Sequence, residues 1–204
     1  MSLLERGIEK GLIKFDEDRN FITYIHQNKK RNYTSPEEKV QAETFLTLAI
    51  SYGYPVKRIK QFVPVQMGSE TKEADIIVYA DDACEETYIL VECKKEEIND
   101  QQFKVAVDQA YSYCVSEGGK YVWTTSKIIN EYYEVPKEKP RSRISIPDIP
   151  QFGVNKLAPY KYVKGGSILS EGKAKEDGVS VPDQIVKQKF FELEIVSENE
   201  LTKI

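Results

Sequence analysis

Two acidic residues and a lysine stand at the ends of two short apolar segments. Asp75 directly precedes one segment, and Glu92 and Lys94 close the next. The acidic turn 81–86 between them predicts a β-hairpin, because both arms are rich in β-branched residues. Pairing that is symmetric about this turn sets Asp75 opposite Glu92.

The same symmetry pairs Ile76 with Val91 and Ile77 with Leu90. Alternation along the second arm then places Glu92 and Lys94 on one face of the strand. The two carboxylates and the ammonium group are therefore expected to converge at one end of the sheet.

Two carboxylates opposed in a sheet repel each other unless a cation lies between them. Mg²⁺ takes its oxygen ligands from one or two carboxylates, and Mn²⁺ is expected to substitute for it. The predicted chemistry is phosphodiester hydrolysis, in which the ion polarises the phosphate and acidifies a bound water. Lys94 would orient or help deprotonate the nucleophile and stabilise developing charge. Alternatively, Glu92 and Lys94 form an ordinary exposed ion pair, which contributes less than about 1 kcal/mol.

A helix is expected before this hairpin, from about residue 36 to residue 52. Ser35 is a candidate N-cap, Pro36 suits the first helical position, and Glu38 would complete a capping box. The sequence Gly-Tyr-Pro ends the helix, and the alternating segment 59–65 predicts a strand.

A second helix is expected at 100–115, followed by a strand at 121–125. A right-handed crossover makes this strand parallel to the preceding one. The fold class is α/β, with a core of helix, three-stranded antiparallel meander, helix and parallel strand in a mixed sheet flanked by helices. A short N-terminal helix and a strand at 21–25 precede this core.

Three regions follow from this order. Residues 1–33 form the N-terminal helix and strand that pack on the core, and 34–135 form the core itself. Residues 136–204 form an irregular extension containing Pro and Gly, with a last strand at 190–196. A capping-box sequence at 197–204 opens a helix that stops after one turn, so we expect further domains of a longer protein to follow.

The composition is that of a water-soluble globular protein, with 40% hydrophobic and 30% charged residues among 204. There is no apolar run long enough to span a bilayer and no apolar signal-peptide core, so we expect a cytoplasmic protein that contacts no membrane. The three cysteines show no metal-ligand spacing and are expected to be reduced thiols. The net charge of -4 argues against strong DNA binding unless basic stretches such as Lys29-Lys30-Arg31 and 137–143 are grouped on the surface.

The residues Glu-Ala-Asp75 and Ile-Leu-Val-Glu92-Cys-Lys94 resemble the PD-(D/E)xK nuclease motif, with Ala74 where a proline often precedes the aspartate. The chain is most similar to the N-terminal nuclease domain of type I restriction enzyme R subunits and of related single-chain restriction and modification enzymes. The resemblance covers roughly 34–126. It implies a restriction-endonuclease-like core and a magnesium-dependent endonuclease, a hydrolase that cuts double-stranded DNA in a restriction-modification system.

The resemblance also implies that a glutamate of the first helix joins the metal site. Glu38 is preferred because it lies on the same helical stripe as Phe45, facing the sheet. Glu43 lies near the edge of this stripe, and Glu37 points further away. A purely structural capping role for Glu38 remains the alternative.

In the same family, the backbone carbonyl of Cys93 would be a further metal ligand. A Gln and a Tyr four residues apart on the following helix, here Gln109 and Tyr113, would hold the DNA backbone or support the site. The alternative for Gln109 is an ordinary surface residue, and for Tyr113 an aromatic residue at the edge of the core.

The sequence has neither a phosphate-binding loop motif nor a methyltransferase motif of the Asn-Pro-Pro-Tyr kind. The partners implied are therefore a translocase ATPase or a methyltransferase, together with specificity modules, in the same chain or complex. Two alternative functions stay open. One is a non-catalytic DNA-binding or subunit-docking module with a nuclease-like fold, and the other is a repair or junction nuclease of the same superfamily.

Overall fold

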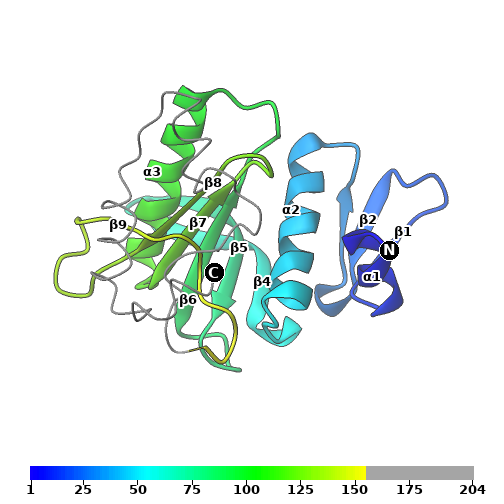
Figure 1. The fold of residues 1–204 in the computed structure, drawn as a ribbon, viewed down its shortest axis with the longest axis horizontal. Coiled ribbons are helices and arrows are strands. Elements are labelled where there is room, and N and C mark those ends of the chain that lie inside the picture. Colours follow the sequence, from blue (N-terminus) through cyan, green and yellow to red (C-terminus); the bar gives the residue numbers. More distant parts are fainter. Residues whose placement is uncertain (155–204) are drawn as a thin grey trace, which may run out of the picture. The chain divides into compact units, whose positions relative to one another are not determined.

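The computed structural model describes residues 1–154, which form two β-sheets and three α-helices (Figure 1). The larger sheet has the strand order β4-β5-β6-β7-β8-β9, and the smaller has the order β1-β2-β3. The helices are α1 (Leu3–Glu9), α2 (Pro36–Leu46) and α3 (Asp100–Ser116). The strands are β1 (Ile13–Phe15), β2 (Phe21–Tyr24), β3 (Lys29–Asn32), β4 (Ile59–Met67), β5 (Glu70–Tyr79), β6 (Thr87–Cys93), β7 (Tyr121–Thr125), β8 (Asn130–Glu134) and β9 (Ile144–Ser145).

The central hairpin has the register that its symmetry predicted. Ile76 lies opposite Val91 and Ile77 opposite Leu90, and the pairing shifts only after Val78, toward the turn. Strand β4 pairs antiparallel with β5, and β7 pairs parallel with β6, which confirms the predicted meander and the predicted parallel strand. Strands β8 and β9 extend the sheet beyond what the sequence predicted.

Both faces of the large sheet are buried. On one face, α2 contributes Phe45 to a core cluster that contains Ile76 and Val91. On the other face, α3 contributes Ala110 to a second cluster that contains Leu90. Burial on both faces explains why the central strands are nearly continuous apolar runs in the sequence.

Helix α2 begins at Pro36 and continues as a π-helical turn to Ser51, which agrees with the predicted span to within one residue. The predicted capping box is wrong, because the Ser35 side chain makes no cap hydrogen bond. The Glu38 carboxylate instead accepts hydrogen bonds from the Tyr24 hydroxyl and from Arg31. A charge-assisted bond to a guanidinium is stronger than one to a backbone N–H, so this partner is favoured.

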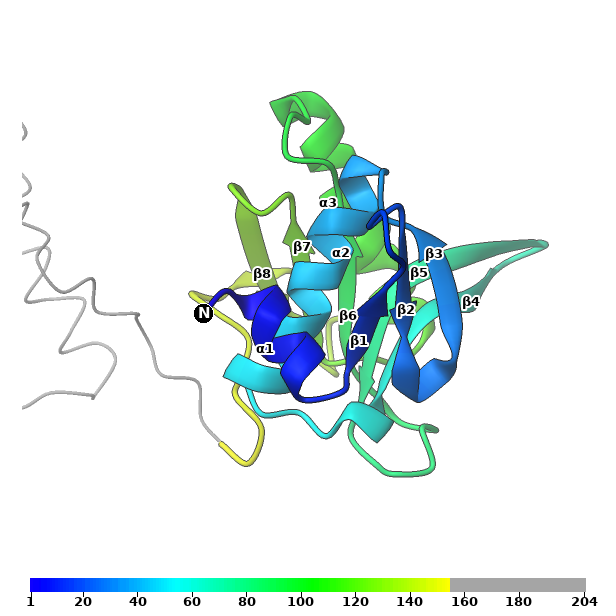
Figure 2. The same ribbon diagram turned by 90° about the vertical axis from the view of Figure 1, so that its right-hand side faces the viewer.

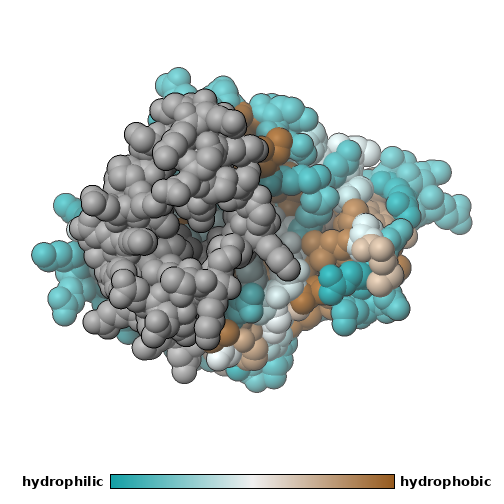
Figure 3. Space-filling model, in the orientation of Figure 1, coloured by the Kyte–Doolittle hydropathy of each residue, from teal (hydrophilic) through white to brown (hydrophobic). Residues whose placement is uncertain are grey.

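Residues 1–33 form α1 and the small sheet, which lie beside α2 and β4 (Figures 1 and 2). The N-terminal helix and the strand near 21–25 are confirmed, whereas β1 and β3 were not predicted. The connection to the large sheet is apolar and polar: Ile22 and Tyr24 share a core cluster with Ile59, and the His26 ring Nε2 lies 3.0 Å from the carbonyl oxygen of Ile59. Hydrophobic residues gather at the surface along the seam between α1 and α2 (Figure 3), where Ile8 of α1 is 42% exposed.

Residues 136–154 pack on the core as mostly irregular chain, as predicted for this part of the extension. The Tyr52 hydroxyl donates to Asp148 at 2.6 Å, and the Tyr54 hydroxyl donates to the carbonyl oxygen of Pro150 at 2.7 Å. The strand predicted at 190–196 and the helix predicted at 197–204 lie outside the described residues. Within 1–154, the helices are too short or too polar to cross a bilayer.

The central strand β6 tests how strongly this core supports the fold. Ile89 is fully buried between α2 and the sheet, whereas Val105 on α3 is 61% exposed. We expect Ile89→Ala to lower the free energy of unfolding by about 2–5 kcal/mol, because it leaves a cavity. The matched truncation Val105→Ala should change it by less than about 0.5 kcal/mol. Urea denaturation measures both, and equal losses in the two variants would contradict the assigned core.

Candidate active site

Asp75 is held at the point where the pairing of β5 with β6 stops. Counted from the hairpin turn, the last regular pair of the ladder is Ile76 with Val91, and Asp75 is the next residue of β5. Its carboxylate then takes the place of a backbone acceptor, because Oδ2 accepts a 2.6 Å hydrogen bond from the N–H of Cys93. From α2, the Gln41 amide donates to the carbonyl oxygen of Asp75 at 3.0 Å. Both β6 and α2 therefore fix this aspartate.

Glu92 and Lys94 interact side by side at the end of β6, as alternation along the strand predicted. Lys94 Nζ lies 2.8 Å from Glu92 Oε1. The Glu92 side chain is only 4% exposed, and among the described residues its Oε2 is buried without a hydrogen-bond partner. A buried oxygen that lacks a partner is unfavourable, so this atom is available to a cation.

The electrostatics of these three groups follow from burial and crowding. Burial, followed by the charge of Glu92, raises the pKa of Asp75 to about 8. Burial also raises the pKa of Glu92, although Lys94 opposes this shift. Burial alone would lower the pKa of Lys94, but the charge of Glu92, its hydrogen bond and the charge of Asp75 together outweigh burial, so the pKa is raised. Lys94 therefore remains an ammonium group at neutral pH.

The donor set fits a hard divalent cation. Two crowded carboxylates whose pKa values are raised gain from a cation that neutralises them, and carboxylate oxygen is the ligand type that Mg²⁺ prefers. Within residues 1–154, no group of three or more Asp, Glu, His or Cys side chains is arranged to hold a metal. The structure thus provides an acidic pair, and Glu38 does not complete it as a third carboxylate.

The helix glutamates differ from the sequence prediction. Glu38 is buried against Tyr24, with 2.6 Å from the hydroxyl to Oε1, and its Oε2 lies 3.4 Å from Arg31 Nε. Burial raises the pKa of Glu38. The charge that reaches Asp75 from this helix is that of exposed Glu37, which contributes to raising the pKa of Asp75 after burial and Glu92. Glu37 itself is exposed, as expected for a residue that points further from the apolar stripe of the helix.

A signal for this arrangement was present in the sequence. Glu37 and Gln41 are four residues apart, so they share one face of α2. Gln41 is buried at 4% exposure and holds the main chain of Asp75. A buried glutamine among apolar residues needs a polar partner, and the strand end beside it supplies one.

Gln109 and Tyr113 form a pair on α3, with 2.6 Å between Gln109 Nε2 and the Tyr113 hydroxyl. Tyr113 is buried at 4% exposure in the core cluster between α3 and the sheet. Their shared face agrees with the predicted spacing, and their role toward DNA stays a prediction. The role of the Cys93 carbonyl oxygen also stays a prediction. The N–H of Cys93 binds Asp75, and its thiol is buried with a pKa raised well above the usual value, chiefly by burial.

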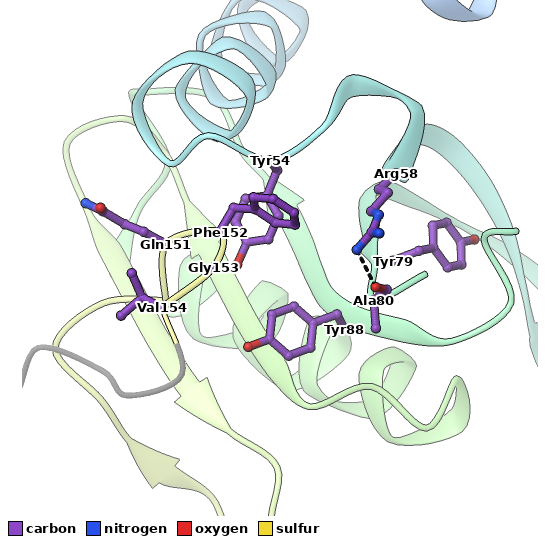
Figure 4. Close-up of a pocket in the computed structure, with 9 residues that line it drawn as sticks. All are labelled: Tyr54, Arg58, Tyr79, Ala80, Tyr88, Gln151, Phe152, Gly153 and Val154. Atoms are coloured by element: carbon purple, nitrogen blue, oxygen red, sulfur yellow. Dashed lines mark hydrogen bonds between the residues drawn. The ribbon is translucent and has the colours of Figure 1, made fainter. Parts of the chain in front are cut away.

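The open pocket in Figure 4 lies at the opposite end of β5 and β6 from the acids. Tyr79 and Tyr88 line it together with Tyr54 and Phe152, and its volume is about 220 Å³. Four residues of strand, or about 13 Å, separate Tyr79 from Asp75. This aromatic pocket is therefore not part of the acidic site.

Comparison with known proteins gives one finding. The family model described as "Type I restriction enzyme R protein N terminus" matches residues 36–150, which is more than half of the chain. The match includes α2, the central hairpin and α3, and so it includes the three converging residues. Searches of curated proteins and of solved structures return no match.

The crowding of the two acids should appear as a pH-dependent loss of stability in metal-free protein. The raised pKa of Asp75 means that folding favours its protonated form, so its stabilising contribution is complete below pH 4 and is lost as the pH rises to about 8. Asp75→Asn has no charge and retains an acceptor for Cys93. At pH 8.5 in EDTA we expect its free energy of unfolding to exceed that of the parent by at least about 1 kcal/mol. This corresponds to a rise in Tm of roughly 2–4 °C.

The gain from Asp75→Asn should shrink at pH 5, where the parent carboxyl is protonated. The matched control is Glu73→Gln, which removes an exposed carboxylate two residues away on β5. A stability difference for Asp75→Asn that does not change with pH, or a Glu73→Gln variant that behaves in the same way, would refute the crowded pair.

Proposed function

The chain belongs to the family of type I restriction enzyme R protein N termini, and we propose that it is the metal-dependent endonuclease module of a restriction enzyme. Its substrate would be double-stranded DNA, and its reaction the hydrolysis of a phosphodiester bond. Its fold would be the restriction-endonuclease-like core of the PD-(D/E)xK nucleases. The observation that carries the proposal is the buried Glu92 Oε2, which has no hydrogen-bond partner among residues 1–154 and belongs to the group formed with Asp75 and Lys94.

The roles of the three residues follow from their surroundings. Asp75 and Glu92 would hold Mg²⁺, or Mn²⁺ in its place, through carboxylate oxygens that are crowded without it. When bound, the ion supplies Lewis acidity toward a phosphate oxygen and lowers the pKa of a bound water. Lys94 is bound to Glu92 and keeps its proton, so it would stabilise negative charge on the phosphate and orient the nucleophile.

Support for the site would come from its neighbours. Gln41 fixes the main chain of Asp75, so α2 would set the distance between the two metal ligands. The negative charge of Glu37 also reaches the acidic pair from α2, whereas both oxygens of Glu38 are occupied by Tyr24 and Arg31. We assign the Cys93 carbonyl oxygen as a further ligand and the Gln109–Tyr113 pair as a support for the DNA backbone on the basis of family resemblance.

The biological setting is also part of the proposal. A module that cleaves DNA needs other parts to choose a sequence and to move along the duplex. A translocating ATPase or a methyltransferase, together with specificity modules, would supply these functions in the same chain or complex. We expect all of them to act in the cytoplasm.

A second candidate function is a non-catalytic docking module with the same fold. The net charge of -4 favours it, because duplex binding depends on cations that neutralise phosphates. A folded chain that binds a partner subunit but leaves DNA intact with Mg²⁺ and Mn²⁺ would support this second candidate against the first.

Cleavage of supercoiled plasmid tests the catalytic proposal. We expect the chain to nick or linearise the plasmid with Mg²⁺ or Mn²⁺. Asp75→Asn and Lys94→Ala should each reduce the rate by about 100-fold or more, since each removes a group that acts on the transition state. The control is Lys95→Ala, which truncates an exposed lysine next to the site. Activity of the Asp75→Asn and Lys94→Ala variants equal to the parent would refute the assignment.

Metal binding can be measured without turnover. Mn²⁺ in large excess over its Kd should raise the free energy of unfolding of the parent by about 2.7 kcal/mol at 100 times Kd. Glu92→Gln should abolish this increase, because it removes the unpartnered oxygen's charge. Glu96→Gln, at an exposed glutamate beyond the strand, should keep it. If Glu92→Gln retains the full increase, the ion binds elsewhere.

A further inference from the structure

Two cations of β3 are stacked on a single aromatic ring. The guanidinium carbon of Arg31 lies 3.8 Å from the centroid of the Phe62 ring, and Lys29 Nζ lies 5.0 Å from it. Lys30, between them in sequence, lies on a different ring, 4.3 Å from the centroid of Phe21. The basic stretch thus contributes two of its three charges to one place.

Phe62 has a backbone conformation that is rare for an aromatic residue. Its φ is +57°, in the left-handed region that non-glycine residues seldom adopt. The left-handed residue changes which side chains of β4 face each side of the sheet. Phe62 joins the core cluster on the α2 side, while Val63 and Val65 pack with the cluster on the α3 side. The unusual backbone therefore turns the ring toward β3.

The ring that carries the two cations belongs to β4, the strand that pairs with the strand of Asp75. Gln61 pairs with Ile76 and Val63 pairs with Ala74, so Phe62 lies across the strand pair from Asp75. Strained backbone conformations are concentrated at functional sites, where the surrounding structure maintains them. A ring that holds two cations one strand away from Asp75 has such a position.

Each cation is fixed but still able to bind an anion. Lys29 Nζ contacts the carbonyl oxygens of Gln61 at 3.2 Å and Phe62 at 3.4 Å, neither of which is charged. Arg31 gives its Nε–H to Glu38, and its side chain remains 43% exposed. The planar guanidinium has five N–H donors, so most of them remain for another acceptor.

Glu38 is itself held in place. Its other oxygen accepts the 2.6 Å hydrogen bond from the Tyr24 hydroxyl, and the residue is 6% exposed. The chain of contacts from Tyr24 through Glu38 to Arg31 therefore sets the guanidinium over the ring of Phe62. Glu38 acts through Arg31 and is a positioning residue.

We propose that Lys29 and Arg31, stacked on Phe62, form a subsite for a backbone phosphate of DNA that flanks the scissile phosphate at Asp75. This inference rests on the proposed function and deepens it. Two cations at one point bind a phosphate better than scattered ones, and Arg matches phosphate geometry with two parallel donors. A local cationic subsite also explains how a chain of net charge -4 can approach a polyanion.

The test is the salt dependence of DNA binding, measured by fluorescence anisotropy of a labelled 30-base-pair duplex in Ca²⁺ between 25 and 200 mM NaCl. Each phosphate contact adds about 0.9 to the slope of log affinity against log salt. The double variant Lys29→Gln, Arg31→Gln should lower the slope by about 0.9, because it removes one phosphate contact. Lys30→Gln removes one positive charge from the same strand, as Lys29→Gln does, and should lower it by less than about 0.5.

Further variants separate phosphate binding from a structural role. Lys29→Gln alone leaves Arg31 on Glu38 and should lower the slope by less than the double variant but by more than Lys30→Gln does. Arg31→Lys keeps the charge and should retain most of the slope, while Glu38→Gln should weaken binding several-fold at unchanged thermal stability of the core. Inorganic phosphate should displace the duplex no better than NaCl at equal ionic strength, whereas selective displacement would indicate a free-phosphate site and overturn the proposal.

The outcomes distinguish failure of the phosphate subsite from failure of the nuclease function. If the parent binds and cleaves DNA but the double variant and Lys30→Gln have equal slopes, the subsite is refuted and the nuclease function stands. If the parent binds no duplex at any salt concentration, both proposals fail. A selective loss of slope in the Lys29 and Arg31 variants, with the slope of Lys30→Gln close to that of the parent, supports the subsite.

Discussion

The structure depends on keeping two carboxyl groups together at the end of a pair of hydrogen-bonded strands. The backbone ladder between β5 and β6 brings Asp75 and Glu92 side by side, although their charges repel each other. The N–H of Cys93 compensates one oxygen of Asp75, and Lys94 compensates one oxygen of Glu92. The compensation is incomplete, because Glu92 Oε2 has no partner within the described chain. This incomplete compensation supports the proposal of an additional cation at the site.

The central part of the fold was predictable because it depends on local rules. A turn fixes the register of a hairpin, and alternation fixes the face on which Glu92 and Lys94 lie, so the pairing of Ile76 with Val91 follows from counting residues. The limits of the helical region 36–51, which comprises α2 and the π-helical turn, follow from Pro36 and from the Gly-Tyr-Pro sequence after it. These features need no knowledge of distant parts of the chain.

Other features depend on contacts between distant residues and were missed for that reason. Helical phase correctly gave Glu38 as the buried glutamate, but it could not show that Tyr24 and Arg31, from strands outside the core, would occupy its oxygens. The short polar strand β3 has no hydrophobic pattern and forms because β2 and β4 lie beside it. The left-handed backbone at Phe62 has no sequence signal, since glycine or asparagine is the usual residue in that region.

Cys93, the last residue of β6, stands between Glu92 and Lys94 in the sequence. Its side chain is 2% exposed and belongs to the core cluster on the α2 side. Side chains alternate along a strand, so Glu92 and Lys94 share one face while the Cys93 side chain between them packs on the opposite face. Because one anchor serves both neighbours, a displacement of the core at this point would carry the carboxylate and the ammonium group in the same direction. The pair would move as a single body, and its internal spacing of 2.8 Å would survive changes that shift its position relative to Asp75.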